Sequence, residues 1–138
     1  MRLGFTGTQR GMTVEQQTTI WKLLSELQID EIHHGDCIGS DAKMDAIAKA
    51  FRIKTIAYPP INSYKRAYCD ADEIKDPEEY LKRNHNIVDA TEVLLATPLT
   101  ADEVLRSGTW STIRYAMKTH KPVYLIQPGG KLNETVQL

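Results

Sequence analysis

Arg106-Ser-Gly-Thr-Trp-Ser-Thr-Ile113 is the stretch of sequence around which the chain is organised. It follows the apolar run 93–96 and opens a helical pattern that ends near His120. Small residues and hydroxyl groups at a junction between a strand and a helix leave backbone N–H groups uncovered at the helix N-terminus, where the helix dipole favours an anion. The stretch therefore predicts a strand-to-helix junction that binds a phosphate.

Two other junctions have the same character. They are Gly7-Thr-Gln-Arg-Gly-Met-Thr13 and His34-Gly-Asp-Cys-Ile-Gly-Ser-Asp41. Neither contains a GxGxxG fingerprint or the lysine of a Walker motif, so the standard dinucleotide and P-loop chemistries are not supported. Three such turns on one edge of a sheet predict a nucleotide-like small molecule as the ligand.

Apolar runs and helical spacings alternate along the chain. The expected strands are Leu3 to Thr6, Asp30 to His34, Lys54 to Tyr58, Glu92 to Thr97 and Pro122 to Ile126. Thr13 and Gln16 are expected to cap the first helix and Pro77 to begin the third, after an excursion over residues 61 to 76. This pattern predicts one α/β domain over residues 1–138, with a Rossmann-like, doubly wound, mainly parallel five-stranded sheet in the order 3-2-1-4-5 and helices on both faces.

The composition argues against several classes of partner. The chain has 138 residues, with 17 basic and 18 acidic side chains and a formal net charge of −1, so no broad basic surface for nucleic acid is expected. Cys37 and Cys69 have no CxxC partner, which argues against a disulfide framework and favours a reduced, cytoplasmic setting. No segment approaches the roughly 20 apolar residues that cross a bilayer, and the N-terminus enters a strand rather than a signal peptide.

Several polar side chains leave alternatives open. Thr8 and Gln9 are candidates for bonds to a base or a ribose, and Arg10 is either an anion contact or a solvated surface charge. Asp36 and Asp41 either accept hydrogen bonds from ribose hydroxyls or cap a helix.

Further candidates lie near the quoted stretch. Glu103 and Arg106 are three residues apart, so on a helical turn they form either a local ion pair or a pair that orients a ribose or supplies a general base. Trp110 shares a helical stripe with apolar residues, which favours packing over base stacking. His33 and His34 point to opposite faces of a strand, and no metal site is expected.

The sequence resembles the SLOG superfamily of Rossmann-like domains over nearly its whole length. The resemblance is carried by Gly4-Phe-Thr-Gly-Thr8, the His34 to Asp41 segment, Arg83-Asn84 and the stretch from Arg106 to Thr112. That group includes the lonely-guy (LOG) phosphoribohydrolases, DNA-processing protein A and sensor domains that bind ADP-ribose-type nucleotides. The resemblance implies a nucleotide or nucleotide-derived ligand, phosphate contacts from Arg83 and from Ser107 to Thr109, and often a dimer. We therefore expect a homodimer, and we expect no cofactor.

The motifs and the resemblance together define an expected ligand site. Its residues are Gly7, Thr8, Gln9, Arg10, Gly35, Asp36, Gly39, Ser40, Asp41, Arg83, Asn84, Arg106, Ser107, Gly108, Thr109 and Trp110.

The sequence departs from the phosphoribohydrolases just after this site. Their motif continues with paired acidic residues, whereas this chain has Ser111-Thr112. A carboxylate near the sugar lowers the barrier to cleavage of an N-glycosidic bond, so its loss favours binding or sensing of a nucleotide or ADP-ribose-like ligand. The alternative is an N-glycosidic hydrolase or deoxyribosyltransferase that uses Glu103 or Asp36 as its nucleophile or base, with Asp41 as a third carboxylate that can take over from the missing acid. Binding of single-stranded DNA is a third class, but the chain lacks the basic stripe and interleaved aromatic residues that it needs.

Overall fold

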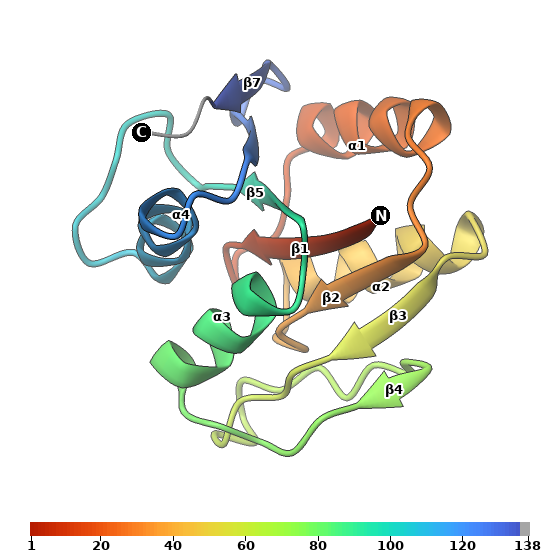
Figure 1. The fold of residues 1–138 in the computed structure, drawn as a ribbon, viewed down its shortest axis with the longest axis vertical. Coiled ribbons are helices and arrows are strands. Elements are labelled where there is room, and N and C mark those ends of the chain that lie inside the picture. Colours follow the sequence, from red (N-terminus) through yellow and green to blue (C-terminus); the bar gives the residue numbers. More distant parts are fainter. Residues whose placement is uncertain (136–138) are drawn as a thin grey trace.

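The structure of the protein, a computed structural model, describes residues 1–135 and contains one seven-stranded sheet. The sheet order is β4-β3-β2-β1-β5-β6-β7, and only the pairing of β7 with β6 is antiparallel (Figure 1). The elements are β1 (Arg2–Gly7), α1 (Val14–Glu26), β2 (Glu31–His34), α2 (Ser40–Ala50), β3 (Lys54–Ala57), β4 (Glu73–Ile74), α3 (Tyr80–Asp89), β5 (Val93–Thr97), α4 (Gly108–Lys118), β6 (Val123–Ile126) and β7 (Leu132–Thr135).

The predicted α/β class is confirmed, and the predicted number of strands is wrong. The five expected strands lie in the expected order, as β3-β2-β1-β5-β6. The two additional strands, β4 and β7, extend the sheet at its two edges. β4 has two residues, and β7 has one leucine followed by three polar residues, so neither carries the apolar run by which buried strands are recognised. The predicted domain extends to residue 138, and its last three residues lie outside the described part of the chain.

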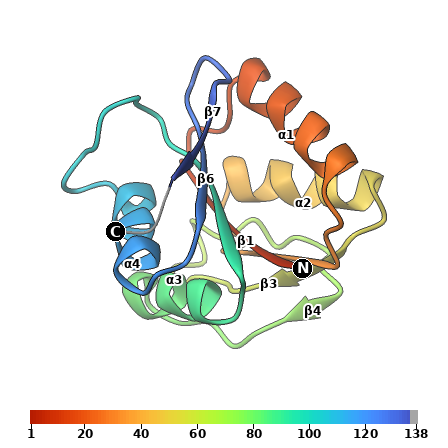
Figure 2. The ribbon, with the colours of Figure 1, turned by 45° about the horizontal axis from the view of Figure 1, so that its top comes forward.

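Helices cover both faces of the sheet, as predicted. One hydrophobic core joins β1, α1 and α2 and contains Phe5, Ile20 and Met44. A second core on the opposite face joins β5 to α3 and α4, through residues such as Leu94, Val88 and Ile113. Figures 1 and 2 show α1 and α2 on one side of the sheet and α3 and α4 on the other.

The start of α1 is fixed by the predicted capping box. The Thr13 hydroxyl accepts a hydrogen bond from the Gln16 N–H at 3.0 Å, and the Gln16 side-chain oxygen accepts one from the Thr13 N–H at 3.0 Å. The buried Gln16 amide nitrogen also donates to the carbonyl oxygens of Pro98 and Ile126, at 3.0 Å each. Gln16 therefore ties the N-terminus of α1 to the chain just after β5 and to the end of β6.

The start of α3 differs from the prediction. The helix begins at Tyr80, and Glu79 is its N-cap, with a carboxylate that accepts a hydrogen bond from the Lys82 N–H at 3.1 Å. Pro77 lies before the helix, and Glu78 forms an isolated bridge with Pro60. An acidic residue is favourable both at the N-cap and in the first turn of a helix. The sequence alone therefore did not show which of these two positions Glu79 occupies.

The edge strand β4 is short and carries charge. Glu73 forms ion pairs with Lys75 at 2.7 Å and with Lys54 of β3 at 3.9 Å. The side chains of this strand are exposed. None of the helices within residues 1–135 is long and apolar enough to cross a membrane.

The buried carboxylate of Asp45 attaches α2 to β2. Asp45 accepts a hydrogen bond from His34 Nε2 at 2.8 Å and forms an ion pair with Lys49 at 2.8 Å. Burial alone would raise the pKa of Asp45, but these two bonds outweigh burial and lower the pKa to about 2. A carboxyl group with a lowered pKa stabilises the folded state above its ordinary pKa, and this contribution is lost as the pH falls.

Replacing Asp45 with asparagine is therefore expected to destabilise the protein by about 2 kcal/mol near pH 6, with most of this difference disappearing between pH 4 and pH 2. Urea unfolding of both proteins at pH 6, pH 4 and pH 2.5 measures the difference. The exposed control Asp102→Asn should differ little from the wild type throughout. A difference for Asp45→Asn that does not change with pH would contradict the account of this ion pair.

Candidate functional site

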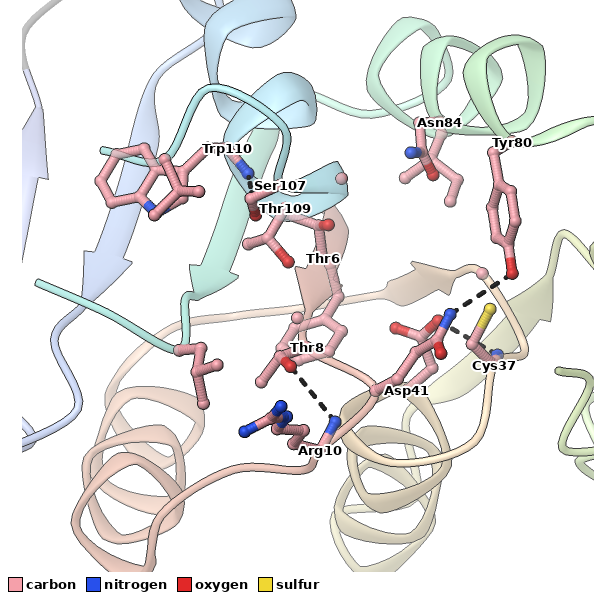
Figure 3. A pocket seen from close by; sticks show the side chains of 18 of the residues that line it. Thr6, Thr8, Arg10, Cys37, Asp41, Tyr80, Asn84, Ser107, Thr109 and Trp110 are labelled. Carbon is pink, nitrogen blue, oxygen red and sulfur yellow. Dashed lines mark hydrogen bonds between the residues drawn. The ribbon is translucent and has the colours of Figure 1, made fainter. Parts of the chain in front are cut away.

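A cavity of about 420 Å³ opens at the carboxyl edge of the sheet, where β1 and β5 lie side by side. The strand order reverses at this point, which is where doubly wound sheets bind their ligands. The three predicted junctions contribute to its walls, together with α3 (Figure 3). The lining residues are Phe5, Thr6, Gly7, Thr8, Gln9, Arg10, Gly35, Cys37, Asp41, Tyr80, Arg83, Asn84, Ile87, Leu99, Thr100, Val104, Ser107, Gly108, Thr109 and Trp110.

The N-terminus of α4 forms one wall of the cavity. Ser107 is the N-cap, and its hydroxyl accepts a hydrogen bond from the Trp110 N–H at 3.2 Å. Within residues 1–135 the backbone N–H groups of Gly108 and Thr109 have no hydrogen-bond partner. A Cβ added at Gly108 would meet no protein atom within 4 Å, so open space lies beside these N–H groups. This wall therefore offers two unpaired donors at the positive end of a helix.

Arg83 of α3 lies at the floor of the cavity and is only 4% exposed. One guanidinium nitrogen, Nη1, donates to the carbonyl oxygens of Gly35 and Tyr58, the latter at 3.1 Å. Among the described residues, the other nitrogen, Nη2, contacts only the Cys37 sulfur, at 3.6 Å, and Nε has no hydrogen-bond partner. No carboxylate in the described part of the chain lies within ion-pair distance of this guanidinium. Because a buried charge without a counter-charge is costly, this site favours an anion.

Tyr80 and Asn84 lie one turn apart on α3 and project toward the cavity (Figure 3). The Tyr80 ring lies 5.1 Å from the Arg83 guanidinium, and its hydroxyl accepts a hydrogen bond from the Gln9 amide at 3.3 Å. Gln9 in turn accepts a hydrogen bond from Lys65 at 3.1 Å. The Asn84 carboxamide has no hydrogen bond within residues 1–135, so both its donors and its acceptor are free for a ligand.

Asp41 is the one carboxyl side chain among the residues that line the cavity. Its Oδ2 atom accepts a hydrogen bond from the Cys37 N–H at 3.1 Å. The capping alternative does not describe this residue, because α2 is capped by Gly39 and no side chain bonds to the cap. Burial raises the pKa of the Asp41 carboxyl, and the charges of His34 and Arg83 oppose this rise.

Asp36 does not line the cavity, although the sequence placed it there. It has a positive φ of 52° and is buried beneath the excursion between β3 and β4. Its Oδ2 accepts a hydrogen bond from Arg66 Nε at 3.0 Å, and its Oδ1 accepts one from the Cys69 N–H at 2.8 Å. Its carbonyl oxygen accepts a further bond from the Ala67 N–H at 2.7 Å. The carboxylate is thus occupied in holding the excursion against the loop after β2.

Glu103 and Arg106 also lie outside the cavity lining, and they do not pair with each other. Glu103 follows two bends at 101–102, and Arg106 lies in a separate turn that is closed by a hydrogen bond from the Ser107 N–H to the Val104 carbonyl oxygen at 3.2 Å, so the three-residue spacing does not bring them together. Glu103 instead forms an ion pair with Arg114 of α4 at 2.7 Å. Neither Glu103 nor Asp36, the two residues predicted to be catalytic in an enzyme, therefore lines the cavity.

The glycines of the predicted loops differ in what they do. A Cβ at Gly7 would lie 2.5 Å from Ser40 Cβ, and one at Gly35 would lie 2.2 Å from Arg83 Nη1. Gly39 has a φ of 91° and packs against the Gln9 backbone. Gly39 and Ser40 lie behind the lining, and the Ser40 hydroxyl donates to the Thr8 carbonyl oxygen at 2.6 Å. These glycines let the loops pack closely, whereas Gly108 leaves room for a ligand.

His34, Asp45 and Cys69 place three possible metal-ligand atoms within 4.8 Å of one another. His34 Nδ1 accepts a hydrogen bond from the Asp36 N–H at 3.0 Å, so the proton of a neutral ring lies on Nε2, which donates to Asp45. In this tautomer Nε2 carries the proton and the Nδ1 lone pair accepts the Asp36 N–H bond, so neither ring nitrogen is available to a cation. Burial and the nearby carboxylates raise the pKa of the Cys69 thiol. The cluster of His34, Asp45 and Cys69 is therefore best described as a hydrogen-bonded network.

Eight lining residues were not predicted from the sequence: Phe5, Thr6, Cys37, Tyr80, Ile87, Leu99, Thr100 and Val104. Two signals identify some of them in retrospect. Tyr80 precedes Asn84 by four residues, a spacing that places both on one face of a helix. Leu99 and Thr100 follow directly after β5, at the carboxyl edge where ligands bind.

Comparison with known proteins identifies the fold. No family model and no curated protein matches the sequence. Among solved structures, the molybdenum cofactor binding protein from Rippkaea orientalis aligns with a TM-score of 0.71 and 20% identity, over 91% of this chain and 76% of its own. TM1055, a structural genomics target, aligns with a TM-score of 0.67 and 14% identity, over 94% of this chain and 75% of its own. DNA processing protein A from Streptococcus pneumoniae aligns with a TM-score of 0.66 and 20% identity over 90% of this chain, which spans only 49% of that protein.

Two glycines of the predicted site are expected to respond oppositely to alanine. Gly39→Ala should lower the free energy of unfolding by about 2–4 kcal/mol, because the methyl group would meet the Gln9 backbone at 2.2 Å and the positive φ is unfavourable. Gly108→Ala should change it by less than about 1 kcal/mol, in the stabilising direction, because the added carbon meets open space and alanine favours a helix. Urea unfolding of both variants decides the point, and similar losses of stability in both would show that the space beside Gly108 is filled.

Proposed function

We propose, from the SLOG fold that this chain shares with those three structures, that the protein binds a small anionic ligand, a nucleotide or nucleotide-derived molecule, in the cavity at the carboxyl edge of its sheet. One observation carries the proposal: the guanidinium of Arg83, buried without an acidic partner, shares a cavity with the unpaired N–H groups of Gly108 and Thr109. Both features favour negative charge, and Arg10 adds a further positive charge at the exposed rim.

Other features support a small molecule rather than a polymer. The cavity volume of about 420 Å³ lies within the range of roughly 300–1,000 Å³ that is usual for such ligands. Its walls combine apolar side chains, such as Ile87 and Leu99, with a few polar groups that have no protein partner. The structural neighbour from Rippkaea orientalis is described as a molybdenum cofactor binding protein, which supports a small-molecule ligand for this fold.

Binding or sensing is favoured over hydrolysis. The residues that replace the acidic pair of the phosphoribohydrolases are Ser111 and Thr112, and neither lines the cavity. The Thr112 hydroxyl donates to the Gly108 carbonyl oxygen at 2.9 Å, so it is engaged within α4. Of the three carboxylates considered for the hydrolase or transferase alternative, Glu103 and Asp36 lie outside the cavity lining and Asp41 is part of it. An ADP-ribose-like ligand, a cytoplasmic location and a homodimer stay predictions.

The decisive test alters charge at a position where the fold tolerates a side chain. Gly108→Asp puts a carboxylate beside the unpaired N–H groups, and acidic residues in the first turn of a helix stabilise it. We expect the variant to unfold at the same temperature as the wild type or slightly above it, and to lose at least 90% of its affinity for an anionic ligand. Arg10→Gln should weaken binding about 5- to 30-fold through loss of a charge-assisted contact.

Thermal unfolding with a panel of nucleoside phosphates and ADP-ribose measures both effects. A ligand at 100 times its dissociation constant adds about 2.7 kcal/mol and should raise the midpoint by roughly 5–15 °C. Gly108→Ala controls for size, and Arg52→Gln controls for loss of an exposed positive charge far from the cavity. If no compound shifts the wild-type midpoint, or if Gly108→Asp responds like the wild type, the proposed function is wrong.

A further inference from the structure

Asp41 places a carboxylate oxygen in a cavity that otherwise favours negative charge. The side chain is 6% exposed and lies in the first turn of α2. Its Oδ2 atom is anchored on the Cys37 N–H at 3.1 Å, while no protein group within residues 1–135 bonds to Oδ1. Figure 3 shows the carboxyl group projecting into the space that Thr8, Asn84 and Thr109 also face. One oxygen therefore sets the position of the side chain and the other is free for a ligand.

Within residues 1–135, no hydrogen bond or ion pair to the protein accounts for the Oδ1 oxygen of Asp41. It makes no ion pair, since Arg83 lies beyond ion-pair distance and no other described cation pairs with it. It does not cap α2, which is capped by Gly39. The oxygen faces the cavity, and within residues 1–135 it has no hydrogen-bond donor, so its partner is expected to come from the ligand.

A carboxylate oxygen repels phosphate oxygens and accepts hydrogen bonds from hydroxyl groups. The neighbouring Asn84 carboxamide is also free, and it can donate to the same hydroxyls or accept from them. The cavity thus has an anion-binding end, at Gly108 and Thr109 of α4, and a hydroxyl-binding end, at Asp41 of α2. Burial raises the pKa of Asp41, and hydroxyl donors oppose this rise by stabilising the ionised form.

We infer that Asp41 determines specificity by accepting hydrogen bonds from the hydroxyl groups of a sugar attached to the bound phosphate. The ligand class is then a phosphorylated sugar or nucleotide with free vicinal hydroxyls, in preference to inorganic phosphate or a deoxy sugar phosphate. The inference rests on the proposed anion site and adds to it the chemistry of the group next to the anion.

Sugar phosphates without a base test this inference independently of which base the site accepts. Uniformly ¹⁵N-labelled protein is titrated with inorganic phosphate, ribose 5-phosphate and 2-deoxyribose 5-phosphate, and amide shifts are followed by NMR. All three should move the amide signals of Gly108 and Thr109. Ribose 5-phosphate alone should also produce a large shift of the Cys37 amide, which bonds to Asp41, and should bind about 5- to 30-fold more tightly than the deoxy sugar.

Asp41→Asn keeps the shape of the side chain and an acceptor for the Cys37 N–H, and it removes the charge. In this variant the two sugar phosphates should bind with affinities within about twofold of each other. Glu103→Gln removes an acidic group outside the cavity lining and should keep the wild-type preference.

The outcomes separate the two proposals. Equal wild-type affinities for the two sugars, or a preference that survives in Asp41→Asn, overturn the role of Asp41 even if phosphate still moves the signals of Gly108 and Thr109. If Asp41→Asn does not fold, the Cys37 amide of the wild type decides, because a shift produced equally by inorganic phosphate also overturns that role. If none of the three compounds moves the Gly108 and Thr109 signals, the anion site itself is refuted, and the inference with it.

Discussion

The buried guanidinium of Arg83 is the interaction on which the site depends. It reaches from α3 to the carbonyl oxygens of Gly35, just after β2, and Tyr58, just after β3, and so holds the ends of two strands to a helix on one face of the sheet. The same group brings to the floor of the cavity a positive charge that forms no ion pair within residues 1–135. Stability and ligand preference are therefore coupled, because the side chain that joins these elements also sets the sign of charge that the cavity accepts.

Much of the fold follows from the sequence, because its central strands and amphipathic helices repeat at regular spacing. The capping box at Thr13 and Gln16 and the order of the five central strands are local or topological features that short patterns record. The edge strands were missed because they are short and polar. The predicted start at Pro77 was wrong because Glu79 caps α3, and several neighbouring residues suit the start of a helix equally well.

The site was harder to predict than the fold. The three junctions were correctly expected to meet at one edge, since the carboxyl ends of parallel strands lie together. Sequence did not show which side of each loop faces the cavity, so Asp36 and Asp41 looked equivalent although one holds the excursion and the other faces the ligand space. Likewise, Gly39 and Gly108 both lie in turns of small residues. Only the structure shows that Gly39 packs against the Gln9 backbone and that Gly108 faces open space.

The charged edge strand β4 has a consequence for how copies of the protein meet. An unpaired strand edge is a template for β-sheet addition, and a run of apolar residues there invites aggregation. Here the edge has two residues, and Glu73 is paired with Lys75 and Lys54. A second chain that added a strand at this edge would strip water from these charges. The protein is thereby protected against continuous sheet growth from β4.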